Sequence, residues 1–321
     1  MDCREFIDEW RNDSPTVLVH TSGSTGKPKP MLVEKRRMEA SARRTCRFLG
    51  LKAGDTALLC MPLDYIAGKM MVVRALTCGL QLIAVEPTGH PLADVTASIT
   101  FAAMVPLQVW NSLQVPEERE RLMRIGHLII GGGAVNDELA TALAGFPNAV
   151  WSTYGMTETL SHIALRRLNG TDRSDWYTPF DGIAVSLNAE GCLVIDAPEV
   201  HDGELVTNDI AELSGGRFRI LGRKDNVICS GGIKIQIEEV ERLLHPVLSA
   251  PFMITKSPDR LLGEQVVLLT EATDMEQLRR RCEDVLPRYW HPRRYVCVDR
   301  LPLTATGKPA RAEAERLAAK I

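Results

Sequence analysis

Between residues 56 and 155 the sequence alternates short apolar runs with longer stretches of helical periodicity. The strand-like runs are TALLCM, QLIAV, TFAAMVP, HLIIGGG and AVWSTYG. The helix-like stretches include IAGKMMVVRALTCG, LQVWNSL, EERERLMRIG and NDELATALAG. Strands that take turns with helices in this way indicate an α/β fold with a mostly parallel sheet covered by helices. We expect the functional groups where these strands end.

The pattern changes twice in the rest of the chain. From about Phe180, short β-like pieces punctuated by Gly, Asn and Asp predict a small antiparallel sheet. After Arg223 the amphipathic stretch QIEEVERLLH, two strand-like runs and a second helical stretch predict a smaller α+β unit. A chain of 321 residues is long enough for two domains. We therefore predict a large domain over residues 1–223 and a small one over residues 224–321.

The stretch TSGSTGKPKP, residues 21–30, gathers small, hydroxylated and cationic side chains in one loop. Its glycines permit backbone angles that let several amide N–H groups face one anion, and its hydroxyls add donors. The strand-like TVLVH before it and the helix-compatible EKRRMEASARRTCRFL after it predict a strand-to-helix junction, where phosphates are often bound. It is not a Walker A loop, because two residues separate Gly23 from Gly26 and Pro28 follows Lys27. A flexible surface turn is the alternative.

The segment YGMTET follows the strand-like run NAVWS and carries three different polar groups. Tyr154 offers a flat face for a purine, Thr157 a hydroxyl for a phosphate oxygen, and Glu158 a hard oxygen ligand suited to magnesium. A helix cap is the alternative role for its Thr-Glu pair.

Three further segments carry charged groups that suit a nucleotide. In TND, which we place in a loop between strands, Asp209 could accept hydrogen bonds from ribose hydroxyls, with an Asx turn as the alternative. In LGRKDN, Arg223 could reach ribose or phosphate and Asp225 lies at the predicted domain joint, with a surface salt bridge as the alternative. In TATGKPAR, Lys308 lies on a Gly-bearing loop, where a merely solvated lysine is the alternative.

Composition excludes several other classes of protein. The formal net charge of −3 gives no whole-chain electrostatic reason to bind nucleic acid. The eight cysteines include no CxxC pair, so we predict neither a zinc site nor a redox motif and expect reduced thiols. The opening MDCREFIDEW lacks the features of a signal peptide, and Arg74 interrupts the most apolar stretch. We expect a cytoplasmic enzyme with no nucleic-acid or membrane partner.

In combination, the segments TSGSTGKPK, YGMTE, GRKDN followed by SGG, and TATGK resemble those of the acyl-CoA synthetase and adenylate-forming (AMP-binding) ligase superfamily. The resemblance runs from Thr21 to Arg311, which is essentially the whole chain. It implies that a carboxylate attacks the α-phosphate of ATP to give an acyl-adenylate and pyrophosphate, and that a thiol then displaces AMP. ATP, Mg²⁺ and coenzyme A are therefore the implied cofactors and cosubstrates.

The resemblance also implies roles for individual residues. Thr157 would contact the α-phosphate, Glu158 would hold Mg²⁺, and Lys308 would bridge the acyl carboxylate and the α-phosphate during adenylation. The other implied ATP contacts are Thr21, Ser22, Gly23, Ser24, Thr25, Gly26 and Lys27 for the β- and γ-phosphates, Gly131, Gly132, Gly133 and Tyr154 for adenine, and Asp209 and Arg223 for ribose. A mobile C-terminal domain would rotate about Asp225 and bring Ser230, Gly231 and Gly232 beside the pantetheine tunnel.

Three departures from the family pattern change these expectations. The loop begins at Thr21, so the large N-terminal region of typical relatives is expected to be absent, and a homo-oligomer could complete the scaffold. The segment PLDYIAG has Tyr65 where a histidine is common, which makes Tyr65 a candidate substrate contact. TND replaces the commoner TGD.

The short form, the GGGAV turn and the stretch YGMTETLSHIALRRLNG look most like bacterial o-succinylbenzoate–CoA ligases of menaquinone biosynthesis. An aromatic dicarboxylate substrate needs a cation for the carboxylate that is not activated. We predict Lys69 for this role, with Arg166 or His162 as substitutes, and an ordinary helix-surface lysine as the alternative. Other possible functions are another aryl- or short-chain acyl-CoA ligase, an enzyme that loads a carrier-protein thiol, and a nucleotide-binding regulator without catalysis.

Overall fold

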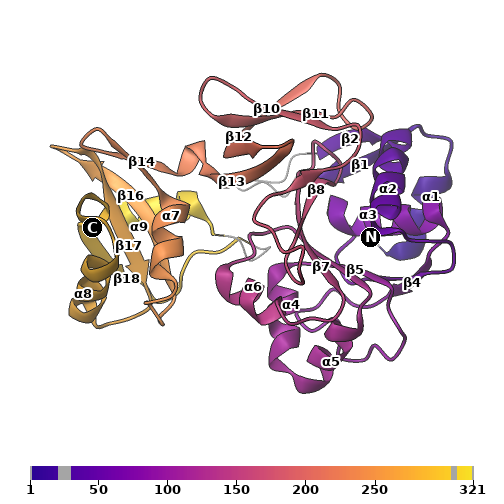
Figure 1. The fold of residues 1–321 in the computed structure, drawn as a ribbon, viewed down its shortest axis with the longest axis horizontal. Helices are drawn as coiled ribbons and strands as arrows, with labels where there is room; N and C mark the ends of the chain where they lie inside the picture. The colour runs from indigo at the N-terminus through magenta and orange to yellow at the C-terminus, as the bar shows by residue number, and fades with distance from the viewer. Residues whose placement is uncertain (1, 21–29, 305–308, 320–321) are drawn as a thin grey trace.

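The computed structural model describes residues 2–20, 30–304 and 309–319. The predicted phosphate-loop residues 21–29 and the predicted catalytic Lys308 lie outside the described residues. Figure 1 shows a helix-covered sheet with a small antiparallel sheet beside it, and a C-terminal unit on the other side of the view. No helix in the described ranges is long and apolar enough to cross a membrane.

The large sheet has seven strands within the described ranges, in the order β4-β3-β5-β6-β7-β8-β9. The first five in this order pair in parallel, and β8 and β9 pair antiparallel at one edge. The prediction of a mostly parallel sheet is therefore confirmed. The strands are β3 (Thr56–Leu59), β4 (Gln81–Ala84), β5 (Phe101–Met104), β6 (His127–Ile130), β7 (Ala149–Gly155), β8 (His162–Arg167) and β9 (Thr178–Pro179).

Helices cover both faces of this sheet, and alternate strand residues serve the two cores. Leu59 packs in one core with residues of three helices, while the adjacent Leu58 packs in the other core with residues of three more. This alternation follows from the two-residue period of a strand. The first core involves α1 (Cys3–Arg11), α2 (Lys35–Leu49) and α3 (Ile66–Cys78), and the second α4 (Pro106–Gln114), α5 (Pro116–Arg124) and α6 (Asp137–Leu143).

The predicted strand-to-helix junction at residues 21–30 is wrong. Strands β1 (Thr16–His20) and β2 (Pro30–Glu34) pair antiparallel, with His20 opposite Pro30, and α2 begins only at Lys35. The next described element after β1 is therefore a strand and not a helix. The reason is a pairing that the local pattern does not reveal, because Val17 and Val33 are opposite each other and both are buried.

The small antiparallel sheet is confirmed, but TND is not in a loop. Its strands β10 (Ala184–Leu187), β11 (Cys192–Asp196), β12 (Glu204–Ser214) and β13 (Arg217–Arg223) pair in chain order. Asp209 lies inside β12, opposite Arg223, so the Asx-turn alternative and the loop placement are both wrong. The polar residues of TND suggested a loop. Strand β12 nevertheless continues through them, because β11 and β13 pair with it on its two sides.

The C-terminal unit is an α+β fold around the strand order β15-β14-β17-β16, with β18 parallel to β17. The buried cores of the preceding parts include residues up to Phe218, and those of this unit begin at Ile228. The boundary at residue 224 lies between them and stays a prediction. The elements are η1 (Lys224–Asn226), β14 (Val227–Ser230), β15 (Ile233–Gln236), α7 (Ile237–Leu244), β16 (Phe252–Asp259), β17 (Gly263–Thr270), α8 (Met275–Val285), η2 (Arg288–Trp290), β18 (Arg294–Cys297) and α9 (Arg311–Ala319).

Candidate active site

The carboxyl ends of the neighbouring strands β6 and β7 bring two predicted motifs together. Residues 131–133 follow β6, and residues 154–158 include the end of β7 and the turn after it. A Cβ on Gly131 would lie 2.3 Å from Oγ1 of Thr153, so the two strand ends can approach this closely only at a glycine. Gly132 has a φ of +77°, which L side chains rarely adopt. Gly131 is thus favoured by its contact with β7, and Gly132 by its backbone angle.

The turn between β7 and β8 is tight, and it buries one predicted side chain while it exposes another. A Cβ on Gly155 would lie 2.3 Å from the carbonyl oxygen of Ser161, so the chain reverses against its own backbone. Thr157 is buried, whereas Glu158 is exposed. Because β8 begins at His162 directly after this turn, the helix-cap alternative is wrong.

Thr159 organises this turn, although sequence reasoning did not single it out. It is fully buried, and its hydroxyl accepts a hydrogen bond from the amide of Met156 at 3.1 Å and donates one to the carbonyl of Ser161 at 2.8 Å. Leu160 next to it has a φ of +63°. The second threonine in YGMTET was a possible signal, since Ser and Thr hydroxyls often bond to nearby backbone in turns.

Four residues predicted from three separate segments form one hydrogen-bonded chain. Asp209 accepts a hydrogen bond from the Tyr154 hydroxyl at 2.6 Å and one from Arg223 Nη1 at 3.1 Å. Arg223 Nη2 also donates to Asp225 at 3.0 Å. The chain runs from the end of β7 through β12 and β13 to η1, so it connects the large sheet with the predicted domain joint.

Burial and charge set the protonation of this network. Burial, followed by the nearby charge of Asp209 and the hydrogen bond to it, raises the pKa of Tyr154, so the phenol stays protonated and acts as the donor. Burial lowers the pKa of Arg223, but its bond to Asp225 and the charge of Asp209 outweigh this and raise it. The Tyr154 ring packs edge-on against Phe218, with centroids 5.0 Å apart. Its hydroxyl is thus held toward Asp209 by both packing and hydrogen bonding.

Asn208 stands at the position where TGD has glycine, and its side chain adds a contact to Asp225. Its side-chain amide donates to Asp225 Oδ2 at 3.2 Å, on the same oxygen that Arg223 contacts. A glycine at position 208 has no such group. The TND sequence therefore gives the predicted hinge residue a second partner from β12.

The structure places Lys69 inside the fold rather than on a helix surface. The residue is 3% exposed, and its ammonium donates to the carbonyl of Leu18 at 2.7 Å and lies 3.8 Å from Glu9 Oε2. Burial lowers the pKa of this ammonium. The helix-surface alternative is wrong. The substrate role stays a prediction, since these contacts connect Lys69 to β1 and α1 instead. Tyr65 lies at the N-terminal end of α3, directly before its first residue.

The two substitute cations also have protein partners. His162 is buried, with Nε2 3.1 Å from Thr45 Oγ1, and burial followed by the charge of Arg74 lowers its pKa well below the usual value. It is therefore neutral at pH 7 and cannot supply a positive charge. Arg166 pairs with Asp175 at 3.2 Å and lies over the ring of Tyr177.

Arg74 is a buried cation that sequence reasoning noted only as an interruption in an apolar run. It is 2% exposed, and Nη2 donates to Ser161 Oγ at 2.6 Å. Its Nε has no hydrogen-bond partner, and no carboxylate within the described ranges pairs with it. Burial lowers the pKa of Arg74 to about 10, so it is charged at pH 7. A charge in an apolar helix was the available signal, because such a group is costly unless it is used.

The predicted CoA-side glycines form the turn between β14 and β15. Gly231 and Gly232 have φ values of +58° and +84°, and the Gly231 amide donates to the carbonyl of Leu262 at 2.9 Å. Ser230 is buried at the end of β14. The turn thus lies on a hairpin of the C-terminal unit, away in sequence from the segment that carries Lys308.

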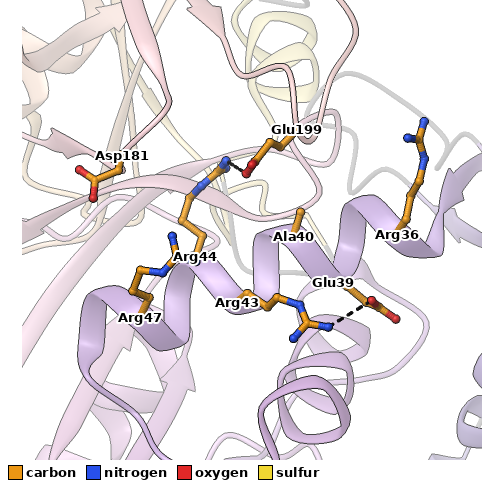
Figure 2. A pocket seen from close by; sticks show the side chains of 8 residues that line it. All are labelled: Arg36, Glu39, Ala40, Arg43, Arg44, Arg47, Asp181 and Glu199. Atoms are coloured by element: carbon orange, nitrogen blue, oxygen red, sulfur yellow. Dashed lines mark hydrogen bonds and ion pairs between the residues drawn. The ribbon is translucent and has the colours of Figure 1, made fainter.

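A pocket of about 250 Å³ lies between α2 and the segments that flank the small sheet. Figure 2 shows that Arg44 reaches across it to Glu199 and that Arg43 turns toward Glu39. Its lining residues are Arg36, Glu39, Ala40, Arg43, Arg44, Arg47, Asp181 and Glu199, and none is a predicted site residue.

The described residues fit a magnesium ion that is held mainly by phosphates. They contain no group of three or more His, Cys, Asp or Glu side chains that could hold a metal alone. Glu158 is an exposed carboxylate, and Mg²⁺ is commonly bound by one or two carboxylates together with substrate phosphates and water.

Comparison with known proteins gives consistent results. A 2-succinylbenzoate–CoA ligase of Salmonella typhimurium is 28% identical over 304 residues, which cover 89% of this chain and 65% of that protein. The solved structure of an acyl-CoA synthetase (AMP-forming)/AMP-acid ligase II-like protein from Dyadobacter fermentans is 34% identical, with a TM-score of 0.67, and covers 95% of this chain and 90% of that chain. A variant of E. coli MenE with bound OSB-AMS is 25% identical, with a TM-score of 0.76, over 96% of this chain and 70% of that chain.

The family model described as AMP-binding enzyme matches residues 4–209. This match contains the GGG turn, the YGMTET turn and Asp209, and it covers more than half of the chain. The chain belongs to the AMP-binding enzyme family.

Proposed function

We propose that this chain is an ATP-dependent acid–thiol ligase. In the first step a carboxylate oxygen of the acid attacks the α-phosphorus of ATP, the bond to the β-phosphate breaks, and pyrophosphate leaves. In the second step the sulfur of coenzyme A attacks the acyl carbonyl, and AMP leaves. The observation that carries this proposal is the chain of hydrogen bonds from Tyr154 through Asp209 and Arg223 to Asp225.

This network is suited to hold a nucleoside. Oδ1 of Asp209 accepts a hydrogen bond from Arg223. The carboxylate can still accept hydrogen bonds from two vicinal hydroxyls, because each oxygen has more than one acceptor site. Thr157 would donate to the α-phosphate, and Glu158 would hold Mg²⁺, which neutralises phosphate charge. Lys308, outside the described residues, would stabilise the charge that develops between carboxylate and α-phosphate.

For the acid we propose o-succinylbenzoate, which would place the chain in menaquinone biosynthesis. Support comes from the relatives named 2-succinylbenzoate–CoA ligase and from MenE with bound OSB-AMS. Arg74 adds a physical argument. A buried guanidinium without a carboxylate partner would be stabilised by the carboxylate of the substrate that is not activated. Its partner Ser161 belongs to the same β7–β8 turn as Thr157 and Glu158.

The proposal is tested by ATP–pyrophosphate exchange across a panel of acids. We expect fast exchange with o-succinylbenzoate and slow exchange with benzoate and short-chain acids. Fast exchange with benzoate alone would show a different acyl-CoA ligase. If AMP release required a phosphopantetheinylated carrier protein instead of coenzyme A, the thiol assignment would be wrong. No exchange with any acid would support a regulator that only binds nucleotide.

A further inference from the structure

Helices α2 and α3 lie side by side, and each carries a cysteine in its C-terminal part (Figure 1). Cys46 on α2 is 4% exposed, and Cys78 is the last residue of α3 and partly exposed. Their thiols are in hydrogen-bonding contact. Cys78 Sγ also lies 4.0 Å from the carbonyl oxygen of Ala42, which is one turn before Cys46 on α2. Two free cysteines that are 32 residues apart in the sequence therefore meet in the fold.

The surroundings of this pair give its two thiols different reactivity. The hydrogen bond with Cys46 lowers the pKa of Cys78, and the charges of Arg43 and Arg74 lower it further, against the opposing effect of burial. The same hydrogen bond, followed by burial, raises the pKa of Cys46. Because the thiolate is the reactive form, the partly exposed Cys78 is the thiol that an oxidant in solution would meet first. Cys46 stays protonated beside it.

Both helices contact the candidate active site close to their cysteines. Thr45 directly precedes the cysteine of α2, and its Oγ1 lies 3.1 Å from Nε2 of His162. Arg74 lies one turn before the cysteine of α3, and its Nη2 donates to Ser161 Oγ at 2.6 Å. The turn that these two contacts reach carries the predicted phosphate and magnesium contacts between β7 and β8. A movement of α2 relative to α3 is therefore transmitted to that turn.

We propose that Cys46 and Cys78 are an oxidation site, which hydrogen peroxide converts to a disulfide and a thiol reductant restores, and that the disulfide slows acyl-adenylate formation. First the Cys78 sulfur attacks one peroxide oxygen, the O–O bond breaks, and the hydroxide that leaves takes up a proton as water. Then the Cys46 sulfur attacks the sulfenic acid sulfur of Cys78, the S–O bond breaks, and the Cys46 proton leaves with the hydroxyl group as water. Two thiols are oxidised by two electrons, and one peroxide is reduced to two waters.

The disulfide would change how α2 and α3 pack against each other. Its sulfur atoms are about 2.05 Å apart, which is much closer than two thiols that only form a hydrogen bond. The bond therefore draws the two cysteines together, and the β7–β8 turn follows through Thr45 and Arg74. A misplacement of about 1 Å can cost on the order of a hundredfold in rate. The effect on activity rests on the proposed function, whereas formation of the disulfide does not depend on it.

The test treats the full-length chain with hydrogen peroxide and follows the bond and the activity separately. Mass spectrometry of unreduced peptides detects a link between residues 46 and 78. ATP–pyrophosphate exchange with o-succinylbenzoate, or with benzoate if that acid is faster, reports adenylation. Cys78→Ala removes the attacking thiol, and Cys46→Ala removes its partner. Cys229→Ala and Cys297→Ala are the matched controls, because both of these cysteines are exposed in the C-terminal unit.

We expect oxidised wild type to contain the linked peptide and its exchange rate to fall by about tenfold to a hundredfold, with recovery after dithiothreitol. Cys229→Ala and Cys297→Ala should behave like wild type in both measurements. Neither Cys78→Ala nor Cys46→Ala should form the link. Cys78→Ala should keep its exchange rate within about twofold of its own untreated value.

Three results would overturn the proposal. Oxidised wild type without the linked peptide refutes the oxidation site. Linked wild type with unchanged exchange refutes the effect on adenylation, and an equal loss of exchange in Cys78→Ala would assign that loss to another residue. If wild type forms the linked peptide but shows no exchange even when reduced, the proposed function fails together with the effect on adenylation, whereas the oxidation site stands.

Discussion

The phenol oxygen of Tyr154 lies 2.6 Å from Oδ2 of Asp209, although 55 residues separate them in the sequence. Tyr154 is at the end of β7 in the large sheet, and Asp209 is inside β12 of the small one. The bond therefore connects the two sheets at the place where the predicted adenine and ribose contacts meet. The binding of a nucleotide by both residues would therefore depend on how the two sheets are placed relative to each other.

Tyr154→Phe removes the hydroxyl and keeps the ring that packs against Phe218. Asp209 then loses one charge-assisted hydrogen bond, which contributes on the order of 1.5–3 kcal/mol. We expect the KM for ATP to rise by roughly 10-fold or more, with a smaller loss of unfolding free energy. Steady-state kinetics and urea unfolding measure the two effects. An unchanged KM for ATP would separate this hydrogen bond from nucleotide binding.

Arg74→Met removes the buried guanidinium and keeps an apolar side chain in the core. If Arg74 pairs with the second carboxylate of the acid, the KM for o-succinylbenzoate should rise by about 10- to 100-fold. Benzoate has no second carboxylate, so its KM should stay constant in the same variant. Equal effects on both acids would mean that Arg74 supports the β7–β8 turn through Ser161 and does not recognise substrate.

Lys69→Met tests the position of the buried ammonium near α1 and β1. The variant loses the part-buried hydrogen bond from the ammonium to the carbonyl of Leu18, which should cost about 1–3 kcal/mol of unfolding free energy. Chemical denaturation measures this loss. The KM for o-succinylbenzoate decides the predicted substrate role, because an unchanged value would exclude Lys69 from the acyl pocket.

His162 makes stability depend on pH in a specific direction. Its pKa is lowered well below 6.5 in the folded chain, so the unfolded state binds a proton that the folded state does not. This contribution is complete above pH 6.5 and is lost as the pH falls below that value. Between pH 7.5 and 5.5, wild type should lose about 1.4 kcal/mol more than His162→Gln. Urea unfolding at both pH values measures it, with the partly exposed His201→Gln as a control. Equal losses in wild type and His162→Gln would contradict the burial argument.

Gly155→Ala tests the tight turn between β7 and β8. The new Cβ would lie 2.3 Å from the backbone oxygen of Ser161 and 2.4 Å from Cα of His162, so the two strands must separate. We expect a loss of at least about 1–3 kcal/mol, together with reduced exchange activity. Gly145→Ala is the matched control, because no atom lies within 4 Å of its added Cβ. A near-neutral Gly155→Ala would mean that this turn can relax.

Much of the architecture was predictable because its signals are local. The alternating runs from TALLCM to AVWSTYG predicted five parallel strands and the helices between them, and the bounds of β7 coincide with the run AVWSTYG. The small antiparallel sheet and the C-terminal α+β unit followed from similar local patterns. Buried strands and amphipathic helices carry their period in consecutive residues, so the sequence alone determines these elements.

Pairing between distant segments was not predictable in the same way. The hairpin of β1 and β2 and the position of Asp209 inside β12 both depend on which strand lies alongside. A polar stretch such as TND is typical of a loop. It becomes part of a strand only because neighbouring strands form hydrogen bonds with its backbone. No local pattern contains this information.

The sequence by itself determined the family, the order of the elements and which polar residues suit ATP chemistry. Only the tertiary structure decided that Lys69 is an internal contact, that Arg74 is a buried cation without a carboxylate, and that Arg311 is joined to Glu241. The physical reason is that a charged side chain has the same chemical identity in any fold. Its protonation, partners and use depend on burial and on the groups that folding brings to it.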